Sequence, residues 1–568
     1  MENMDYDLRA IQEVRNLARL GQIATEQIAN YNEEQIDKIV RNMVRVAEAN
    51  EVSLAQMAVE ETGFGKVEDK AYKNHMASTL LYQAIKDMKT IGIIGEDPVA
   101  RTMDVADPVG LLMGIVPSTN PTSTAIFKSI IAIKARNAII FSPHPSAAKC
   151  TQKAARLMYE AAVEAGAPAN IIGCISMPSV QATDELMHCK EVKMIIATGG
   201  PGMVKAAYSA GKPALGVGAG NSPAYIERTA NVQQAITNIM ASKTFDYGTI
   251  CASEQSIICE ECNKDAVIAE LKRQGGYFMT PEETDKVCKL LFKNGHAMNA
   301  KFVGRSPFRI ATAAGITIPE NTKVLIGPQG GVGEGYPLSY EKLTSVLAFY
   351  VVKDWHEACE LSIDLLQNGI GHTMSLHTED RNVVLEFTRK PASRILVNTG
   401  SSMGGTGAST GLLPSFTLGC GTWGGSSVSE NVSPLHLVNI KKVAYGTKNC
   451  ATLAADDPTF HHPEFASADS ASCMAVPSCG TPVSPVPAAA PCCGTPVSPA
   501  PAVVPSCGST AGYLSPAEYQ NNNSGISYST GCNSCTDNSQ APVASDQPIN
   551  TAQLTDMINT LVKAMRGE

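Results

Sequence analysis

Cys251 lies in a segment of small and polar residues, Phe245-Asp-Tyr-Gly-Thr-Ile-Cys251-Ala-Ser-Glu-Gln255, where its thiol could act as a nucleophile. Upstream, Pro117-Ser-Thr-Asn120-Pro121 places a side-chain amide at the start of an expected helix. Thr198-Gly-Gly-Pro-Gly202 is a glycine turn that would let helix N-terminal amides approach a pyrophosphate. A lone cysteine is often an inert buried residue, and this turn does not match GxGxxG. Together, however, the thiol, the amide and the turn are the parts needed to oxidise an aldehyde through a thioester.

These segments follow apolar runs in a region where expected strands and helices alternate. The expected strands are 110–116, 138–142, 171–176 and 193–197, and the expected helices are 121–136, 147–165 and 201–210. This alternation predicts a parallel sheet covered by helices on both faces. A second mixed region runs from about 241 to 425, with an expected helix at 355–368 and strands at 346–352 and 394–398. Residues from about 6 to 90 show helical periodicity.

The composition restricts the class of protein. The chain has 568 residues, 44% of them hydrophobic, and a net charge of -9 with both signs mixed, which argues against a nucleic-acid partner. No apolar run reaches the roughly 20 residues needed to span a membrane. The N-terminus lacks the apolar core of a signal peptide, so the 17 cysteines are expected to be thiols. We therefore expect a cytoplasmic protein, or one in a compartment filled from the cytoplasm.

The sequence changes character after about Gly446. The stretch to Pro548 is rich in Pro, Ala, Ser and Cys, and Cys479-Gly-Thr-Pro-Val-Ser-Pro485 recurs as Cys493-Gly-Thr-Pro-Val-Ser-Pro499. Such a segment cannot bury enough apolar surface to fold, which predicts a disordered linker. Beyond it, an apolar stripe at spacings of three and four predicts an amphipathic helix; its members are Leu554, Met557, Ile558, Leu561, Val562 and Met565.

The body of the chain, from about 6 to 446, resembles the aldehyde dehydrogenase superfamily and its CoA-acylating branch, most closely the propionaldehyde dehydrogenases of bacterial microcompartments. The Cys251 segment carries this resemblance together with Glu61-Thr-Gly-Phe-Gly65, Pro117-Ser-Thr-Asn120, Ala197-Thr-Gly-Gly200, Gly218-Ala-Gly-Asn221-Ser-Pro223, Pro337-Leu-Ser-Tyr-Glu341 and Leu435-His436-Leu-Val-Asn439. The resemblance implies an α/β fold with a Rossmann-type parallel-sheet cofactor domain and an α/β catalytic domain. We divide the chain into N-terminal helices with the NAD/CoA-binding domain (1–240), the catalytic domain (241–426), a return segment with an oligomerisation strand (427–446), the linker (447–549) and the terminal helix (550–568).

The resemblance also implies roles for individual residues. Cys251 would be the nucleophile, and Asn120 would hold the oxyanion together with the Cys251 backbone amide. Glu341 would bind the nicotinamide ribose. The expected cofactor-binding residues are Thr119, Ser142, Pro143, His144, Thr198, Gly199, Gly200 and Glu341. The cofactors would be NAD and coenzyme A, with no metal, although the choice between NAD and NADP stays open.

One departure from the family pattern separates its branches. Hydrolytic members carry a water-activating glutamate where this chain has Val217 or Gly218. Without a base to activate water, the acyl-enzyme would wait for a thiol, which indicates transfer to CoA. The predicted substrate is propionaldehyde, with acetaldehyde as the alternative. A hydrolytic dehydrogenase and an inactive scaffold are rival interpretations.

The terminal helix, 550–568, resembles the encapsulation peptides of microcompartment enzymes. It would bind shell proteins and place the enzyme, a homodimer or homotetramer, in the lumen. A coiled-coil helix and a membrane-surface helix are the competing interpretations, and the scarcity of basic residues disfavours the latter.

Overall fold

The computed structural model describes residues 5–460. The chain divides into two units, 1–462 and 463–568, and everything below concerns the first. Most of the predicted linker and the whole predicted terminal helix, 550–568, lie outside the described residues. Among the described helices, none combines the length and apolar character needed to cross a lipid bilayer.

The chain begins with a helical region whose ends follow capping rules. Helix α2 starts with a capping box, in which Asn32 accepts from the Gln35 backbone amide and Gln35 accepts from that of Asn32. Helix α3 ends at Gly63, whose φ of 66° is the left-handed conformation that glycine adopts readily. The helices are α1 (Tyr6–Ile28), α2 (Glu33–Ala49), α3 (Glu51–Thr62), α4 (Val67–His75), a π-helical turn (Met76–Leu80) and α5 (Leu81–Ile85).

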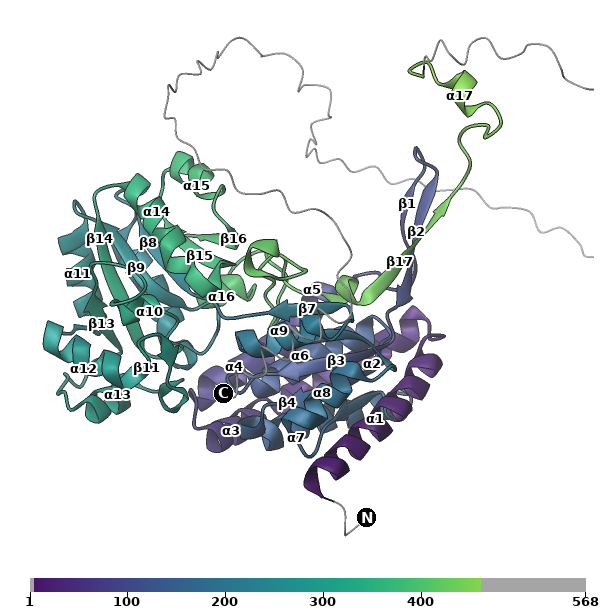
Figure 1. The fold of residues 1–568 in the computed structure, drawn as a ribbon, viewed down its shortest axis with the longest axis horizontal. Helices are drawn as coiled ribbons and strands as arrows, with labels where there is room; N and C mark the ends of the chain where they lie inside the picture. The colour runs from purple at the N-terminus through teal and green to yellow at the C-terminus, as the bar shows by residue number, and fades with distance from the viewer. Residues whose placement is uncertain (1–4, 461–568) are drawn as a thin grey trace, which may run out of the picture. The chain divides into compact units, whose positions relative to one another are not determined.

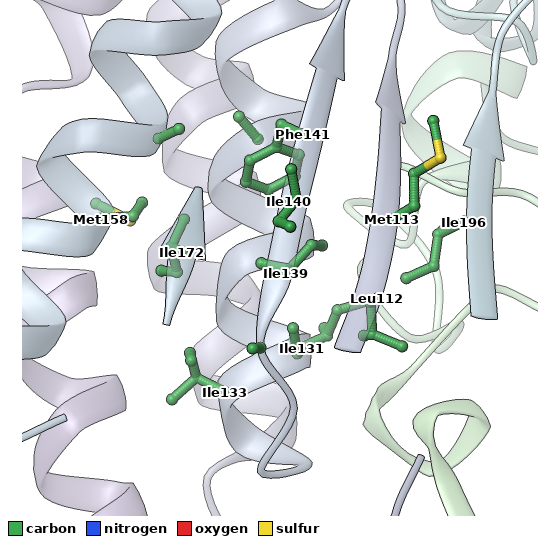
Figure 2. Close-up of a cluster of buried hydrophobic side chains, with 14 of the residues drawn as sticks. Leu112, Met113, Ile131, Ile133, Ile139, Ile140, Phe141, Met158, Ile172 and Ile196 are labelled. Atoms are coloured by element: carbon green, nitrogen blue, oxygen red, sulfur yellow. The ribbon is translucent and has the colours of Figure 1, made fainter. Parts of the chain in front are cut away.

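The first parallel sheet has five strands in the order β5-β4-β3-β6-β7. Its strands are β3 (Leu111–Val116), β4 (Ile139–Pro143), β5 (Ile172–Cys174), β6 (Val192–Thr198) and β7 (Ala214–Val217), and its helices are α6 (Pro121–Lys134), α7 (Ala148–Glu164), α8 (Val180–His188) and α9 (Pro201–Ser209). Helix α6 is buried along its whole length, including its polar residues Thr122, Lys128 and Lys134. Figure 2 shows part of this core, where Ile140 and Phe141 of β4 lie near Met158 of α7 and Ile172 of β5.

The second parallel sheet has seven strands in the order β10-β13-β14-β9-β8-β15-β16. These are β8 (Ser222–Ile226), β9 (Glu254–Glu260), β10 (Gly276–Phe278), β13 (Val324–Pro328), β14 (Val346–Val352), β15 (Gly371–His377) and β16 (Ala392–Val397). The helices of this region are α10 (Val232–Thr244), α11 (Lys264–Arg273), α12 (Pro281–Leu291), α13 (Pro307–Ala314), α14 (Trp355–Leu366), α15 (Arg381–Phe387) and α16 (Ser401–Gly405), and β11 (Phe292–Lys293) pairs with β12 (Ala297–Met298). The chain changes sheets between β7 and β8, while the domain boundary at residue 240 stays a prediction.

A third, antiparallel sheet joins distant parts of the chain. Its order is β1-β2-β17, from β1 (Gly92–Asp97), β2 (Thr102–Pro108) and β17 (Val438–Ala444), and it projects beyond the other two sheets (Figure 1). A short helix, α17 (Leu453–Asp456), follows. The prediction of an α/β fold with parallel sheets is confirmed, whereas the sequence analysis did not identify the β1–β2 hairpin. Most side chains of this hairpin are partly or fully exposed, so its sequence shows only a weak alternation of apolar and polar residues.

Candidate active site

A cavity of about 370 Å³ contains all ten predicted site residues in its lining. They are Thr119, Asn120, Ser142, Pro143, His144, Thr198, Gly199, Gly200, Cys251 and Glu341. Several of them follow from the topology, because β3, β4 and β6 are parallel neighbours whose carboxyl ends meet at one edge of the sheet. Ligands of open α/β sheets bind at this edge. The structure therefore brings the predicted thiol, amide, glycine turn and carboxylate together.

Cys251 follows an unusual backbone turn. Asp246, Tyr247 and Gly248 have φ values of 48°, 51° and 72°, a left-handed run that is strained for the two residues with side chains. The Cys251 side chain is partly exposed and packs against an apolar cluster that includes Val217. The turn ends at the cavity wall, and β9 begins three residues after the cysteine. The strained turn thus holds the thiol between the two parallel sheets.

The thiol of Cys251 is protonated at rest. Burial raises the pKa of Cys251 to about 12, and the Glu341 carboxylate adds to this rise. The Arg394 guanidinium and the Cys251 backbone amide oppose it. Since the thiolate is the nucleophilic form, the cysteine must lose a proton before or during attack on a carbonyl.

Asn120 immediately precedes helix α6 and presents its amide to the Cys251 segment. Its Oδ1 accepts from Lys73 Nζ at 2.6 Å. Its Nδ2 donates to Thr119 Oγ1 at 3.1 Å and to the Thr249 carbonyl at 3.4 Å. The contact with the Thr249 carbonyl is long for an N–H···O bond, so this donor has capacity for a stronger acceptor.

Glu341 is the only carboxylate among the described residues that line the cavity. Its Oε1 accepts from the Gly220 backbone amide at 2.9 Å. Burial raises the pKa of Glu341 to about 7, while the Gly220 amide, Lys243 and Lys342 act in the opposite direction. Gly220 is required at its position, because a Cβ there would lie 2.0 Å from the Cys251 carbonyl oxygen.

The far part of the cavity fits the phosphate-bearing half of a dinucleotide. Helix α9 begins directly after Gly200, and an added Cβ at Gly200 would meet nothing within 4 Å, so a ligand can approach this backbone closely. The Ser142 hydroxyl is hydrogen-bonded to Thr183 Oγ1 at 2.8 Å, and His144 Nδ1 accepts from the Ser146 amide at 3.2 Å. Burial lowers the pKa of His144, which favours its neutral form. These residues fit NAD(P).

Val217 and Gly218, the two candidates for the position of the water-activating glutamate in hydrolytic relatives, both lie near Cys251. Val217 ends β7 and is buried in the apolar cluster that contacts Cys251. His372 lies close to the other side of Gly220, with its Cγ 3.3 Å from an added Cβ there. Its Nε2 is buried without a hydrogen-bond partner among the described residues, and burial keeps the pKa of His372 well below its usual value. No group of three or more His, Cys, Asp or Glu within residues 5–460 could hold a metal ion.

The sequence analysis missed a buried ionic network beneath the site. Lys70 Nζ and Lys73 Nζ donate to Asp246 Oδ2 at 2.8 Å and 2.5 Å. The sequence analysis noted the motif Glu61-Thr-Gly-Phe-Gly65 but assigned it no role. A Cβ at Gly65 would lie 1.7 Å from Asp246 Oδ1, so only glycine at this position leaves room for that carboxylate. Two lysines three residues apart in the helix that follows this motif were the further clue.

A thiol and an amide donor that line one cavity at the carboxyl ends of parallel strands are the parts of an enzyme that acts through a cysteine. The model of the aldehyde dehydrogenase family matches residues 7–279. An acetylating aldehyde dehydrogenase from Geobacillus thermoglucosidasius has a solved structure that is 53% identical, with a TM-score of 0.77, covering 78% of this chain and 99% of that one. The chain therefore belongs to the aldehyde dehydrogenase family, and it is a CoA-acylating member.

Two further similarities concern the substrate. The bifunctional aldehyde-alcohol dehydrogenase AdhE of Escherichia coli is 49% identical over 449 residues, which are 77% of this chain and 50% of that protein. This chain thus spans about half the length of that relative. The structure of Rhodopseudomonas palustris propionaldehyde dehydrogenase, with bound CoA and an acylated cysteine, is 27% identical, with a TM-score of 0.69, covering 76% of this chain and 97% of that one. The more similar proteins are therefore not the propionaldehyde enzymes that the sequence analysis favoured.

Proposed function

We propose that this enzyme oxidises acetaldehyde with NAD and CoA to acetyl-CoA, through a thioester on Cys251. The observation that carries this proposal is the cavity that Cys251 and Asn120 line together, while Val217 or Gly218, neither of which can accept a proton, stands where hydrolytic relatives carry a water-activating acid. The greater similarity to acetylating and aldehyde-alcohol dehydrogenases supports acetaldehyde over propionaldehyde.

The residues divide the chemistry between them. Cys251 Sγ attacks the aldehyde carbon, and Asn120 Nδ2 with the Cys251 backbone amide would hold the developing oxyanion. Each such donor typically contributes about 2.7–4 kcal/mol to the transition state. Thr198–Gly200, Ser142–His144 and Glu341 would hold NAD, which when bound would accept the hydride from the former aldehyde carbon of the Cys251 adduct. The acyl group then stays on Cys251 until the CoA thiol attacks it.

The lining of the cavity supports NAD over NADP. Neither lysine nor arginine occurs among the described residues that line it. Recognition of a 2′-phosphate usually relies on such a cation. The Ser142 hydroxyl is uncharged, and burial favours the neutral form of the His144 imidazole by lowering its pKa.

The proposed substrate is tested by comparing kcat/KM for acetaldehyde, propionaldehyde and butyraldehyde, each with CoA and either NAD or NADP. We expect acetaldehyde and NAD to give the highest value, because one extra methylene in a tight pocket changes it by about tenfold or more. Acyl-CoA and NADH should form in equal amounts. A higher kcat/KM for propionaldehyde would restore the prediction made from the sequence.

We also propose that residues 550–568 are an encapsulation peptide and that the catalytic unit is a homodimer or homotetramer. The support is the apolar stripe in the sequence, which an oligomer would present to a microcompartment shell in several copies. Deleting 550–568 should leave kinetics and molar mass in solution unchanged, and should release the enzyme from purified compartments. A truncated enzyme that still co-purified with intact shells would contradict this proposal.

A further inference from the structure

Lys73 is buried beneath the candidate active site, where its ammonium group donates three hydrogen bonds. Its side chain is 1% exposed. Its Nζ donates to Asn120 Oδ1 at 2.6 Å, to Asp246 Oδ2 at 2.5 Å and to Thr249 Oγ1 at 2.8 Å. An ammonium has three N–H donors and no acceptor, so these three oxygens match its capacity.

This contact determines which way the Asn120 amide points. An asparagine amide can rotate by 180°, and its hydrogen-bond partners decide which end faces which way. Because an ammonium cannot accept a hydrogen bond, only Oδ1 can face Lys73. Nδ2 must then point the opposite way, towards the Thr249 carbonyl in the segment that leads to Cys251. The positive charge of Lys73 beside Oδ1 also polarises the amide and makes its N–H groups stronger donors.

Asp246 stabilises the buried positive charge of Lys73. Its carboxylate accepts from Lys70, from Lys73, from the Thr249 hydroxyl at 2.6 Å and from the Lys66 backbone amide at 2.8 Å. Burial lowers the pKa of Lys73 to about 8, while Asp246 favours the charged form, so the ammonium predominates at pH 7. Asp246 is also one of the left-handed residues of the turn before Cys251, so one carboxylate anchors both the thiol segment and the lysine that holds the amide.

We propose that Lys73 is a positioning residue that orients and polarises the Asn120 amide for the oxyanion of the Cys251 adduct. This inference rests on the proposed function, in which Asn120 is an oxyanion donor. Lys73 itself does not line the cavity, and therefore acts through Asn120.

The principal test is Lys73→Met, which keeps the length of the side chain but removes its charge and donors. We expect kcat/KM for the aldehyde to fall by about 10²–10³-fold, the usual effect of losing one oxyanion donor. Asp246 keeps Lys70 as a counter-ion in this variant. The matched control is Lys134→Met: this lysine is equally buried, at 2% side-chain exposure, but pairs with Asp37 outside the cavity, so its loss should leave kcat/KM within about threefold.

A double-mutant cycle separates positioning from general support of the fold. If Lys73 acts through Asn120, Lys73→Met should cost no more than about threefold when added to Asn120→Ala. Alkylation of Cys251 by iodoacetamide involves no oxyanion, so its rate should also stay within about threefold in Lys73→Met. Independent, multiplicative losses, or a parallel loss of alkylation, would overturn the proposal.

A second variant, Lys73→Gln, covers the case in which Lys73→Met does not fold. Glutamine can donate or accept, so it no longer forces one orientation on Asn120, and a loss of at least about tenfold is expected. Full activity in Lys73→Gln would also overturn the proposal. Activity of the unmodified enzyme with acetaldehyde, NAD and CoA is measured first, so failure of the proposed function is distinguished from failure of this inference.

Discussion

Cys251→Ala is expected to reduce NADH formation from an aldehyde by at least about 10⁴-fold while the protein stays folded. The thiol is the only nucleophilic sulfur among the described residues that line the cavity, and alanine cannot form the thioester. The substitution removes one partly exposed atom and leaves the strained turn before it unchanged. Steady-state kinetics measure the loss, and a thermal unfolding curve with and without NAD checks the fold and the cavity.

The matched control for this variant is Cys359→Ala. Cys359 is buried in α14, outside the cavity, and its loss should change stability slightly and kcat/KM by no more than about threefold. Substantial turnover by Cys251→Ala would show that another group is the nucleophile. Loss of NAD binding in Cys251→Ala would show instead that the thiol segment is part of the cofactor site.

Omitting CoA is expected to limit the unmodified enzyme to about one NADH per active site, formed in a rapid burst. The acyl group would remain on Cys251 because neither Val217 nor Gly218 can activate water. General-base catalysis contributes about 10²–10⁴-fold, so steady turnover without CoA should be at least about 10²-fold slower than with it. Adding CoA should restore turnover and release acyl-CoA.

Stopped-flow absorbance measures the burst, and mass spectrometry of the intact protein should detect the acylated Cys251. Sustained formation of free acid without CoA would require another base, and Glu341, whose pKa lies at about 7, would be the first candidate. Glu341→Gln distinguishes that role from ribose binding, because loss of a base abolishes the CoA-independent rate without weakening NAD binding.

The sequence was sufficient to predict ten of the residues that line the cavity. Asn120, Ser142 and Thr198 lie where parallel strands end, and neighbouring parallel strands must bring such positions together. Cys251 was recognisable from its unusual local context. Patterns of apolar and polar residues were enough to place the strands and turns, whereas the resemblance to aldehyde dehydrogenases supplied the roles of the individual residues.

The buried ionic network beneath the cavity could not be predicted in the same way. Lys73 and Asp246 are 173 positions apart, and nothing local in either segment indicates the other as its partner. A lysine three residues from another lysine in a helix is usually a solvated residue, and only the packing of α4 against the turn before Cys251 makes it a buried one. The pKa values of Cys251 and Glu341 depend on burial for the same reason.

The pairing of β2 with β17 also has a consequence for how the chain folds. Asn439 Nδ2 donates to the Pro108 carbonyl across 331 positions, and Asn137 Nδ2 reaches the Leu437 carbonyl across 300. Contacts this distant form late, because a long loop must close first. During synthesis, the β1–β2 hairpin therefore leaves the ribosome long before β17, and β2 keeps an unpaired edge throughout that interval. An edge of this kind can recruit strands from other nascent chains, so a ribosome that stalls before residue 438 leaves a fragment prone to aggregation.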